Sequence, residues 1–278
     1  MSRPPSDAPT DAASDAFGRS ILILAPHPDD EVAACHAVAR RALAGGAAVH
    51  VIYLTHGCVD RDTVWRWRRA RYHERLADRR REAEIVAHEM GLSPCRWPDR
   101  PARHLWPELA AVEAEVRAAV EAREVDQLWV PAFEGGNPDH DGANAVASRF
   151  AGLGLSVLEF AEYNLAGGRP RSHVFPEKTG EEQVLVLTPD ERAAKQRALA
   201  LYASEKRNLG SIGTHLETWR PLPVHDYRRP PHPGRLWYAR FQWVPFAHPG
   251  VDRTDPDDVC AAIKAYLSAA SQPALSRH

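Results

Sequence analysis

The sequence is poor in cysteine, with four among 278 residues, and none of them forms a Cys-x-x-Cys pair. A disulfide framework and a zinc site built from thiolates both need closely spaced cysteines, so this composition argues against both. Few and scattered cysteines are typical of proteins in a reducing compartment, and we therefore expect a cytoplasmic protein. The four positions are Cys35, Cys58, Cys95 and Cys260.

Long hydrophobic runs are also missing. Residues 42–59 contain no Asp, Glu, Lys or Arg, but the Gly45-Gly46 pair and two histidines predict a helix end, a turn and a buried strand here. We therefore expect no membrane span. Residues 1–18 have no apolar signal core and are rich in Pro, Ser and Asp, which predicts a disordered N-terminal tail.

Neither sign of charge dominates, since 35 basic residues face 37 acidic ones and the formal net charge is −2. Bulk electrostatics therefore give no reason to expect binding to nucleic acid or to a membrane surface. Trp65 and Trp67 stand among arginines as in some nucleic-acid-binding patches, but acidic residues follow soon after. We favour a solvated helix with a packed aromatic face for this stretch.

Strand and helix patterns alternate from residue 20 onward. This order predicts βαβ units, and hence an α/β fold with a Rossmann-like, mostly parallel sheet and helices on both faces. We predict strands over residues 20–25, 48–54, 126–131, 155–160 and 183–187. Helices are predicted after the loop at residues 26–31 through about residue 44, and over residues 60–91, 106–123 and 142–153, with a further helix opening at Thr188.

Residues 207–250 differ from the rest because they are rich in proline and show little periodicity. We expect them to wrap around the same domain rather than to form a second one. A final short helix is predicted to start at Asp255-Pro256, an N-cap residue followed by proline. Residues 207–278 are therefore interpreted as a C-terminal wrapping segment with a terminal helix.

Two polar clusters follow predicted strands. His27, Asp29 and Asp30 come directly after the first strand, and His140 belongs to a Gly-, Asn- and Asp-rich stretch after the strand ending at Pro131. Ligands of open α/β sheets bind outside the carboxyl ends of the strands, and in the strand order 3-2-1-4-5 the first and fourth strands are neighbours. In that order His27, Asp30 and His140 converge.

Two histidines and one carboxylate with an open fourth position form the ligand set of a catalytic zinc ion, although Fe²⁺ or Co²⁺ would also accept it. A bound metal lowers the pKa of water to about 7, and a nearby carboxylate can take its proton. In the alternative interpretation Asp29 and Asp30 only cap a helix and His140 is an ordinary loop residue. The position of both clusters at strand ends favours the metal site.

The stretch Ala25-Pro26-His27-Pro28-Asp29-Asp30-Glu31 resembles the PHPDDE signature of the LmbE/PIG-L-like zinc-dependent N-deacetylases. Asn137-Pro138-Asp139-His140 stands where that family carries a second motif, usually HPDH. Residues 79–91 are similar to the family's Arg- and Glu-rich helix that ends in glycine. The resemblance covers roughly residues 19–206, which we therefore treat as the deacetylase-like core.

The resemblance implies roles for individual residues. His27, Asp30 and His140 match the ligands of one Zn²⁺ per chain, and Asp29 matches the general base. Glu31 matches the last acid of the motif, with a supporting role. The family hydrolyses N-acyl groups, most often the acetyl group of an amino sugar such as N-acetylglucosamine, so the implied partner is an N-acylated amino sugar or glycoconjugate.

Asn137 departs from the family pattern, because the first residue of HPDH is a histidine that stabilises the oxyanion or protonates the leaving amine. Asparagine can donate a hydrogen bond to an oxyanion, an interaction worth about 3–4 kcal/mol in a preorganised site, but it cannot deliver a proton. Three alternatives follow: Asp29 acts as base and then as acid, another histidine (His56, His215 or His225) takes over, or activity is low.

Substrate contacts are predicted from Arg61, in the loop after the second strand, and from Arg80, in the arginine run that follows. Two further functions stay open beside N-deacetylation: an amidase that cleaves a larger sugar conjugate, and a binding protein that keeps the metal with little turnover because of Asn137. The sequence leaves the oligomeric state open.

Overall fold

The computed structural model describes residues 17–246 and 248–269. Residues 1–16 of the predicted tail lie outside the described residues. The strands are β1 (Ser20–Ala25), β2 (Ala48–Tyr53), β3 (Ser93–Pro94), β4 (Gln127–Pro131), β5 (Ser156–Ala161), β6 (Tyr163–Asn164), β7 (Arg171–Ser172), β8 (Gln183–Val186) and β9 (Leu216–Pro221). The α-helices are α1 (Asp30–Ala44), α2 (Tyr72–Met90), α3 (Leu109–Ala122), α4 (Pro138–Gly152), α5 (Pro189–Leu201), α6 (Lys206–Leu209) and α7 (Pro256–Ser268).

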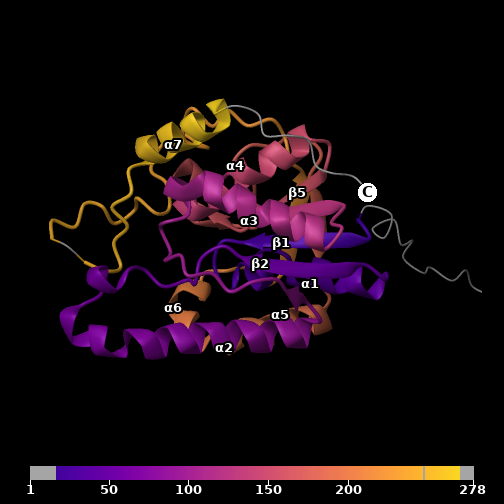
Figure 1. Cartoon of the computed structure of the whole chain (residues 1–278), viewed down its shortest axis with the longest axis horizontal. Helices are drawn as coiled ribbons and strands as arrows, with labels where there is room; N and C mark the ends of the chain where they lie inside the picture. Colours follow the sequence, from indigo (N-terminus) through magenta and orange to yellow (C-terminus); the bar gives the residue numbers. More distant parts are fainter. Residues whose placement is uncertain (1–16, 247, 270–278) are drawn as a thin grey trace, which may run out of the picture.

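A seven-stranded sheet in the order β3-β2-β1-β4-β5-β9-β8 forms the centre of the molecule (Figure 1). The first five strands in this order are parallel to one another, and β9 and β8 complete the sheet as antiparallel strands. The predicted α/β fold is confirmed, and so is the predicted neighbourhood of the first and fourth strands. A small second sheet consists of β6 and β7.

Helices cover both faces of the sheet because the strands bury side chains on both sides. Ile21 and Ile23 of β1 belong to a core that includes residues of α1, α2 and α5, whereas Leu22 and Leu24 belong to a core with α3, α4 and α7. Figure 1 shows these two helical layers on opposite sides of β1 and β2. Among the described residues, none of the helices combines the length and the apolar character of a membrane span.

Two sequence-based predictions need correction. The helix expected over residues 60–91 begins only at Tyr72, after two short 3₁₀ turns at Arg61–Thr63 and Arg66–Arg71. Val64 and Trp65 are extended between these turns and prevent a continuous helix. The aromatic rings at this point stack on each other, Trp65 on Trp67 with centroids 5.0 Å apart, and Trp67 is 72% exposed rather than packed.

The second correction concerns residues 207–250, which contain strand β9 of the central sheet. No apolar alternation marks this strand, because its buried residues include Glu217 and Arg220. Arg220 pairs with the buried Glu159 of β5 at 2.7 Å, so charge pairing replaces the usual hydrophobic signal. The division of the chain at residues 18 and 206 stays a prediction.

Helix α1, which carries the first polar motif, is interrupted at Cys35, whose φ of −143° and ψ of 27° are not helical. Glu217 of β9 accepts hydrogen bonds from the backbone N–H groups of Ala37 and Val38, at 3.0 and 2.9 Å. Lys195 of α5 donates to the Ala33 carbonyl at 2.9 Å and pairs with Glu217 at 2.9 Å. A fully buried ion pair thus satisfies the backbone groups that the interruption releases.

Candidate metal centre and active site

The loop between β1 and α1 brings His27 and Asp30 together. The backbone N–H of His27 donates to Asp30 Oδ2 at 2.7 Å, and His27 Nδ1 lies 3.3 Å from the same oxygen. Asp29, the N-cap residue of α1, forms no capping hydrogen bond through its side chain. These contacts do not fit the alternative interpretation in which Asp29 and Asp30 only cap the helix.

His140 reaches the same point from the neighbouring strand. It lies in the first turn of α4, after β4, and its Nε2 lies 3.2 Å from His27 Nδ1 and 3.3 Å from Asp30 Oδ1. All three residues are buried, and each offers a ligand atom within 4.8 Å of the others. The adjacency of β1 and β4 thus assembles the predicted His27, Asp30 and His140 cluster.

The spacing of these atoms fits a tetrahedral metal ion. Metal–ligand bonds of about 2.0–2.1 Å at tetrahedral angles place neighbouring ligand atoms about 3.3 Å apart. Electrostatics agree: burial by itself lowers the pKa of His27, but Asp30 and Asp139 outweigh it and raise this pKa to about 10. Burial by itself raises the pKa of Asp30, yet His140 and His27 hold it well below its usual range. The cluster therefore favours positive charge.

Asp139 contacts the ring nitrogen of His27 that faces away from the cluster. This residue was not among those predicted from the sequence. Its Oδ2 lies 3.1 Å from His27 Nε2, on the side of the ring that faces away from His140. The carboxylate also accepts hydrogen bonds from the backbone N–H groups of Arg103 at 2.5 Å and Leu105 at 3.1 Å. A carboxylate on the second nitrogen of a metal-binding histidine fixes the tautomer and the orientation of the ring.

Asp29 has a positive φ of 129°, which is costly for a residue with a side chain. The neighbouring Glu31 holds this conformation by accepting the Asp29 N–H at 3.1 Å, and Tyr202 in turn donates its hydroxyl hydrogen to Glu31. Arg79 of α2 donates to the Pro28 carbonyl at 2.7 Å and lies 3.4 Å from Asp29 Oδ2. The carboxylate of Asp29 is thereby fixed beside the candidate metal site.

Arg79 is closely packed against Gly57, where a larger residue would clash with its guanidinium group. A Cβ atom on Gly57, whose φ is +72°, would lie 2.4 Å from Arg79 Nη2. Burial raises the pKa of Asp29 well above its usual range, and the Arg79 guanidinium opposes this shift without cancelling it. The site therefore contains a carboxyl group that holds its proton more strongly than an exposed aspartate does.

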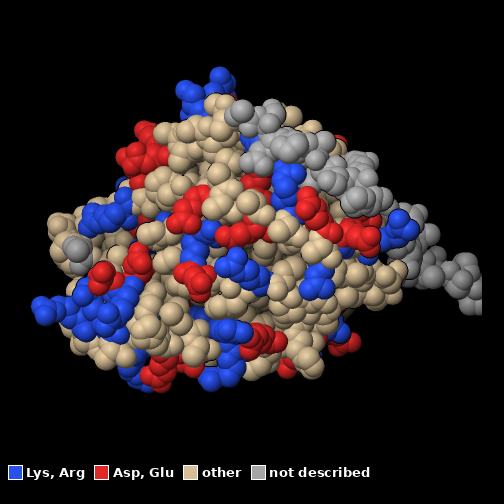
Figure 2. Space-filling view, viewed as in Figure 1, with Lys and Arg blue, Asp and Glu red and all other residues tan. Residues whose placement is uncertain are grey.

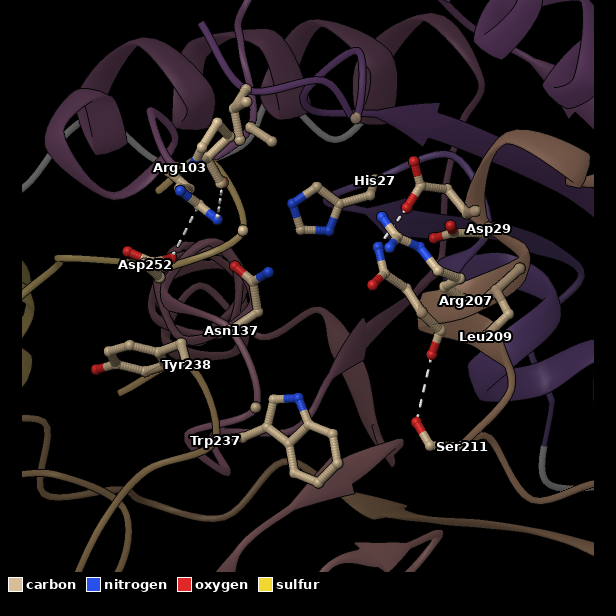
Figure 3. A pocket seen from close by; sticks show the side chains of 18 of the residues that line it. His27, Asp29, Arg103, Asn137, Arg207, Leu209, Ser211, Trp237, Tyr238 and Asp252 are labelled. Carbon is tan, nitrogen blue, oxygen red and sulfur yellow. Dashed lines mark hydrogen bonds and ion pairs between the residues drawn. The ribbon is translucent and has the colours of Figure 1, made fainter. Parts of the chain in front are cut away.

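Asn137 is the N-cap residue of α4, and its Oδ1 accepts the Asp139 N–H at 2.9 Å. The oxygen is thus used by the helix, whereas the amide nitrogen has no partner among the described residues. Asn137 also lines the cavity that contains His27 and Asp29. In Figure 3 its side chain lies between His27 and the pair formed by Arg103 and Asp252.

The cavity, of about 600 Å³, adjoins the candidate metal site. His27, Asp29 and Asp30 lie at its base together with Glu162, a fully buried residue whose two carboxylate oxygens have no partner among the described residues. Trp237 stands on the opposite wall (Figure 3). Burial raises the pKa of Glu162 well above its usual range.

The two predicted substrate-binding arginines lie outside this cavity. Arg80 is exposed on α2 and pairs with Glu84 at 2.8 Å, and Arg61 is exposed in a 3₁₀ turn. Successive helical residues point about 100° apart, so α2 turns Arg79 inward and Arg80 toward solvent. The run of three arginines indicates that one of them faces inward. The packing of α2 decides that this residue is Arg79.

The sequence offers His56, His215 and His225 as residues that could deliver a proton in place of the histidine of the family motif. None of His56, His215 and His225 lines the cavity. His56 accepts the backbone N–H of Cys58 at 3.2 Å, and His225 pairs with the buried Glu159 at 2.9 Å. The side chains of His56 and His225 therefore serve local structure rather than the cavity.

Residues 22–151 match the PIG-L family model, described as GlcNAc-PI de-N-acetylase, so the resemblance to this family is confirmed over these residues. No curated protein matches the sequence.

Solved structures share the fold. A deacetylase of teicoplanin biosynthesis is 16% identical with a TM-score of 0.57, covering 73% of this chain and 97% of its own. The A40926 pseudoaglycone deacetylase Dbv21 is 18% identical with a TM-score of 0.57, covering 74% and 99%. The N,N'-diacetylchitobiose deacetylase from Pyrococcus horikoshii is 16% identical with a TM-score of 0.54, covering 76% and 86%.

Proposed function

We propose that this protein is a metal-dependent hydrolase that removes an N-acyl group, in the first place N-acetyl, from an amino sugar or a glycosylated small molecule. The observation that carries the proposal is the cluster of His27, Asp30 and His140 directly beside a cavity that His27, Asp29 and Asp30 line. Neither the cluster alone nor the carboxylate alone would point to hydrolysis. Together they place a metal site and a general base around one reacting centre.

His27, Asp30 and His140 are the residues that would hold the ion, with one position open for substrate or water. Zn²⁺ is the proposed ion, and the donor set also suits Fe²⁺ or Co²⁺. When bound, the ion supplies Lewis acidity, which polarises the amide carbonyl and makes water a stronger nucleophile. Asp139 binds Nε2 of His27, so that Nδ1 is the ring nitrogen that would be available to the ion.

Asp29 acts as the general base that takes a proton from the attacking water. Its raised pKa suits this role, because a carboxyl group that titrates nearer neutral pH can also return the proton. His56, His215 and His225 do not line the cavity. We assign both proton transfers to Asp29: it takes one proton from the attacking water and returns it to the amide nitrogen, so that the carbon–nitrogen bond breaks with a neutral amine as leaving group and the acyl group departs as the carboxylic acid.

Asn137 stabilises the oxyanion of the tetrahedral intermediate through its amide N–H. The helix cap fixes the Asn137 oxygen on the Asp139 N–H, which directs the amide nitrogen elsewhere. A donor of this kind is worth about 10²–10³-fold in kcat. In this interpretation Asn137 is adapted to its position, and the enzyme does not need the histidine found in the family motif.

The substrate class rests on the family match and on the structural neighbours. The family model is described as a GlcNAc-PI de-N-acetylase, and the neighbours include deacetylases of teicoplanin and of N,N'-diacetylchitobiose. A cavity of about 600 Å³ falls within the range of small-molecule sites. These facts support an N-acetylated sugar, free or within a larger conjugate.

The test combines metal analysis with amine release from a panel of N-acetylated amino sugars and glycoconjugates. We expect about one metal ion per chain and release of a primary amine. Asp29→Asn is expected to abolish release while the metal stays bound. Loss of the metal in this variant would instead mean that Asp29 is a ligand, and metal without release from any panel member would favour a binding protein.

A further inference from the structure

Six arginines line the cavity, and only half of them face a carboxylate. Arg75 pairs with Glu205 at 3.0 Å, Arg79 with Asp29 at 3.4 Å and Arg103 with Asp252 at 3.1 Å. These pairs balance the charges of the cavity floor and of one wall. The other three are Arg68, Arg207 and Arg240.

Arg68, Arg207 and Arg240 have no carboxylate within 4.0 Å among the described residues. They come from three separate parts of the chain, namely the 3₁₀ turn Arg66–Arg71, helix α6 and the segment after Trp237. Arg207 stands beside Asp29 at the edge of the cavity in Figure 3. Their three guanidinium groups therefore meet around one cavity through the tertiary fold, and not because they are neighbours on a single helix.

Arg240 is the most informative of the three because it is only partly exposed. Its guanidinium lies 4.4 Å from the ring centroid of Trp237 and 4.7 Å from that of Phe241. Its Nη1 donates to the Trp237 carbonyl at 2.7 Å. Aromatic rings hold a guanidinium by its flat faces, so the in-plane N–H donors stay available for a ligand.

The surroundings of the opening are basic as well. Figure 2 shows Lys and Arg side chains gathered at the end of the molecule where the 3₁₀ turns and the start of α2 lie, whereas both signs are interspersed over the rest of that face. The same cavity is lined by His27, Asp29 and Asp30. It therefore combines the candidate metal site with three arginines that face no carboxylate among the described residues.

We propose that Arg68, Arg207 and Arg240 bind an anionic group of the substrate, a phosphate or a carboxylate, so that the preferred substrate is an N-acylated sugar that carries such a group away from the amide. Guanidinium forks bind these oxygen anions with paired, charge-assisted hydrogen bonds. The substrate is thus oriented with its acyl group toward His27 and Asp29, and its anionic group toward these arginines.

The orientation of the acyl group rests on the proposed function, whereas the anion site does not. Binding at the anion site can be measured without turnover. Isothermal titration calorimetry of the metal-loaded protein would compare glucosamine, glucosamine 6-phosphate and muramic acid. These sugars share one amino-sugar ring and have no N-acyl group to hydrolyse. We expect at least one anionic sugar to bind about tenfold or more tightly than glucosamine, with the advantage shrinking as salt is raised.

The two anionic probes separate the two sources of charge. Tighter binding of glucosamine 6-phosphate assigns the site to phosphate, and tighter binding of muramic acid assigns it to carboxylate. Equal binding of all three sugars would overturn the proposal. So would a failure of both anionic sugars and of inorganic phosphate to bind in the millimolar range.

Matched variants test the residues. Arg240→Gln and the double variant Arg68→Gln/Arg207→Gln are each expected to remove most of the advantage of the anionic sugar, while glucosamine binding stays unchanged. Arg66→Gln and Lys206→Gln are the controls, because these residues lie on the same turn and the same helix outside the cavity. Retention of the full advantage in both arginine variants would show that the anion binds elsewhere.

Kinetics then separate this proposal from the proposed function. If N-acetylglucosamine 6-phosphate or N-acetylmuramic acid is the better substrate, Arg240→Gln should raise its KM with little change in kcat. If no N-acetyl compound is hydrolysed while the anion site binds as described, the hydrolase proposal fails and the anion site stands.

Discussion

His27 is held between two carboxylates, with Nδ1 3.3 Å from Asp30 Oδ2 and Nε2 3.1 Å from Asp139 Oδ2. The two acids come from different motifs, 109 residues apart in the chain. Asp139 also accepts two backbone N–H groups, so its own position is fixed by the loop that packs over it. The imidazole is therefore oriented before any metal arrives, which lowers the cost of assembling the site.

Asp139→Asn is expected to weaken metal binding about 10–100-fold, because the amide cannot support the imidazole as a carboxylate does. Competition with a chromophoric chelator measures the change. His140→Ala, which removes a proposed ligand, should lose far more affinity than Asp139→Asn. Equal losses in the two variants would place Asp139 among the ligands.

Arg79→Gln is expected to lower kcat about 10-fold or more while the metal stays bound, since the side chain fixes both Pro28 and Asp29. Steady-state kinetics with metal analysis of the same sample check this. Arg81→Gln serves as the control, because Arg81 is exposed on the same helix and pairs with Asp78. A variant with unchanged kcat would show that Asp29 needs no support from α2.

Asn137→Asp and Asn137→Ala separate the two functions of this residue. Aspartate keeps the helix cap but replaces the N–H donor with a negative charge, so kcat should fall about 10²–10³-fold with little loss of stability. Alanine removes both, and should also lower the free energy of unfolding by about 1 kcal/mol. Kinetics and urea unfolding give the two readouts. Normal kcat in the Asp variant would remove Asn137 from the mechanism.

Lys195→Met is expected to reduce the free energy of unfolding by about 3–5 kcal/mol, because Glu217 would remain buried and charged without its partner. Denaturant unfolding followed by circular dichroism measures this loss. Arg80→Gln breaks the exposed Arg80–Glu84 pair and should cost less than about 1 kcal/mol. A small effect of Lys195→Met would mean that Glu217 becomes protonated or reaches water.

Stability should fall as the pH drops from about 6.5 toward 4, in part through His36. Burial lowers the pKa of His36 from 6.5 to about 4. The unfolded chain therefore binds this proton first, and the stability present above pH 6.5 is lost as the pH falls toward the folded-state value. Between pH 7 and pH 5 the loss from this residue is about 2 kcal/mol.

His36→Gln isolates this contribution, since glutamine does not titrate. The variant should unfold with a smaller difference between pH 7 and pH 5 than the parent protein, whatever its stability at pH 7. Identical differences in the two proteins would mean that folding does not shift the pKa of His36.

Local sequence determined the frame of the protein and the types of residue in its candidate site. Apolar runs such as Ser20–Ala25 require burial on both faces of a sheet, and polar residues directly after them fall at the strand ends. This is why His27, Asp30 and His140 could be placed together from the sequence, and why the structure brings them within 4.8 Å. That step needed only the positions of the strand ends and the strand order in which the first and fourth strands are neighbours.

Tertiary packing decided which neighbours these residues have. The rotation of α2 selects Arg79 over Arg80, and the loop carrying Arg103 determines that Asp139 faces His27. Strand β9 escaped prediction because ion pairs with residues far along the chain bury its charges. Side-chain direction and long-range charge pairing depend on how distant segments meet, and no local pattern of residues encodes that.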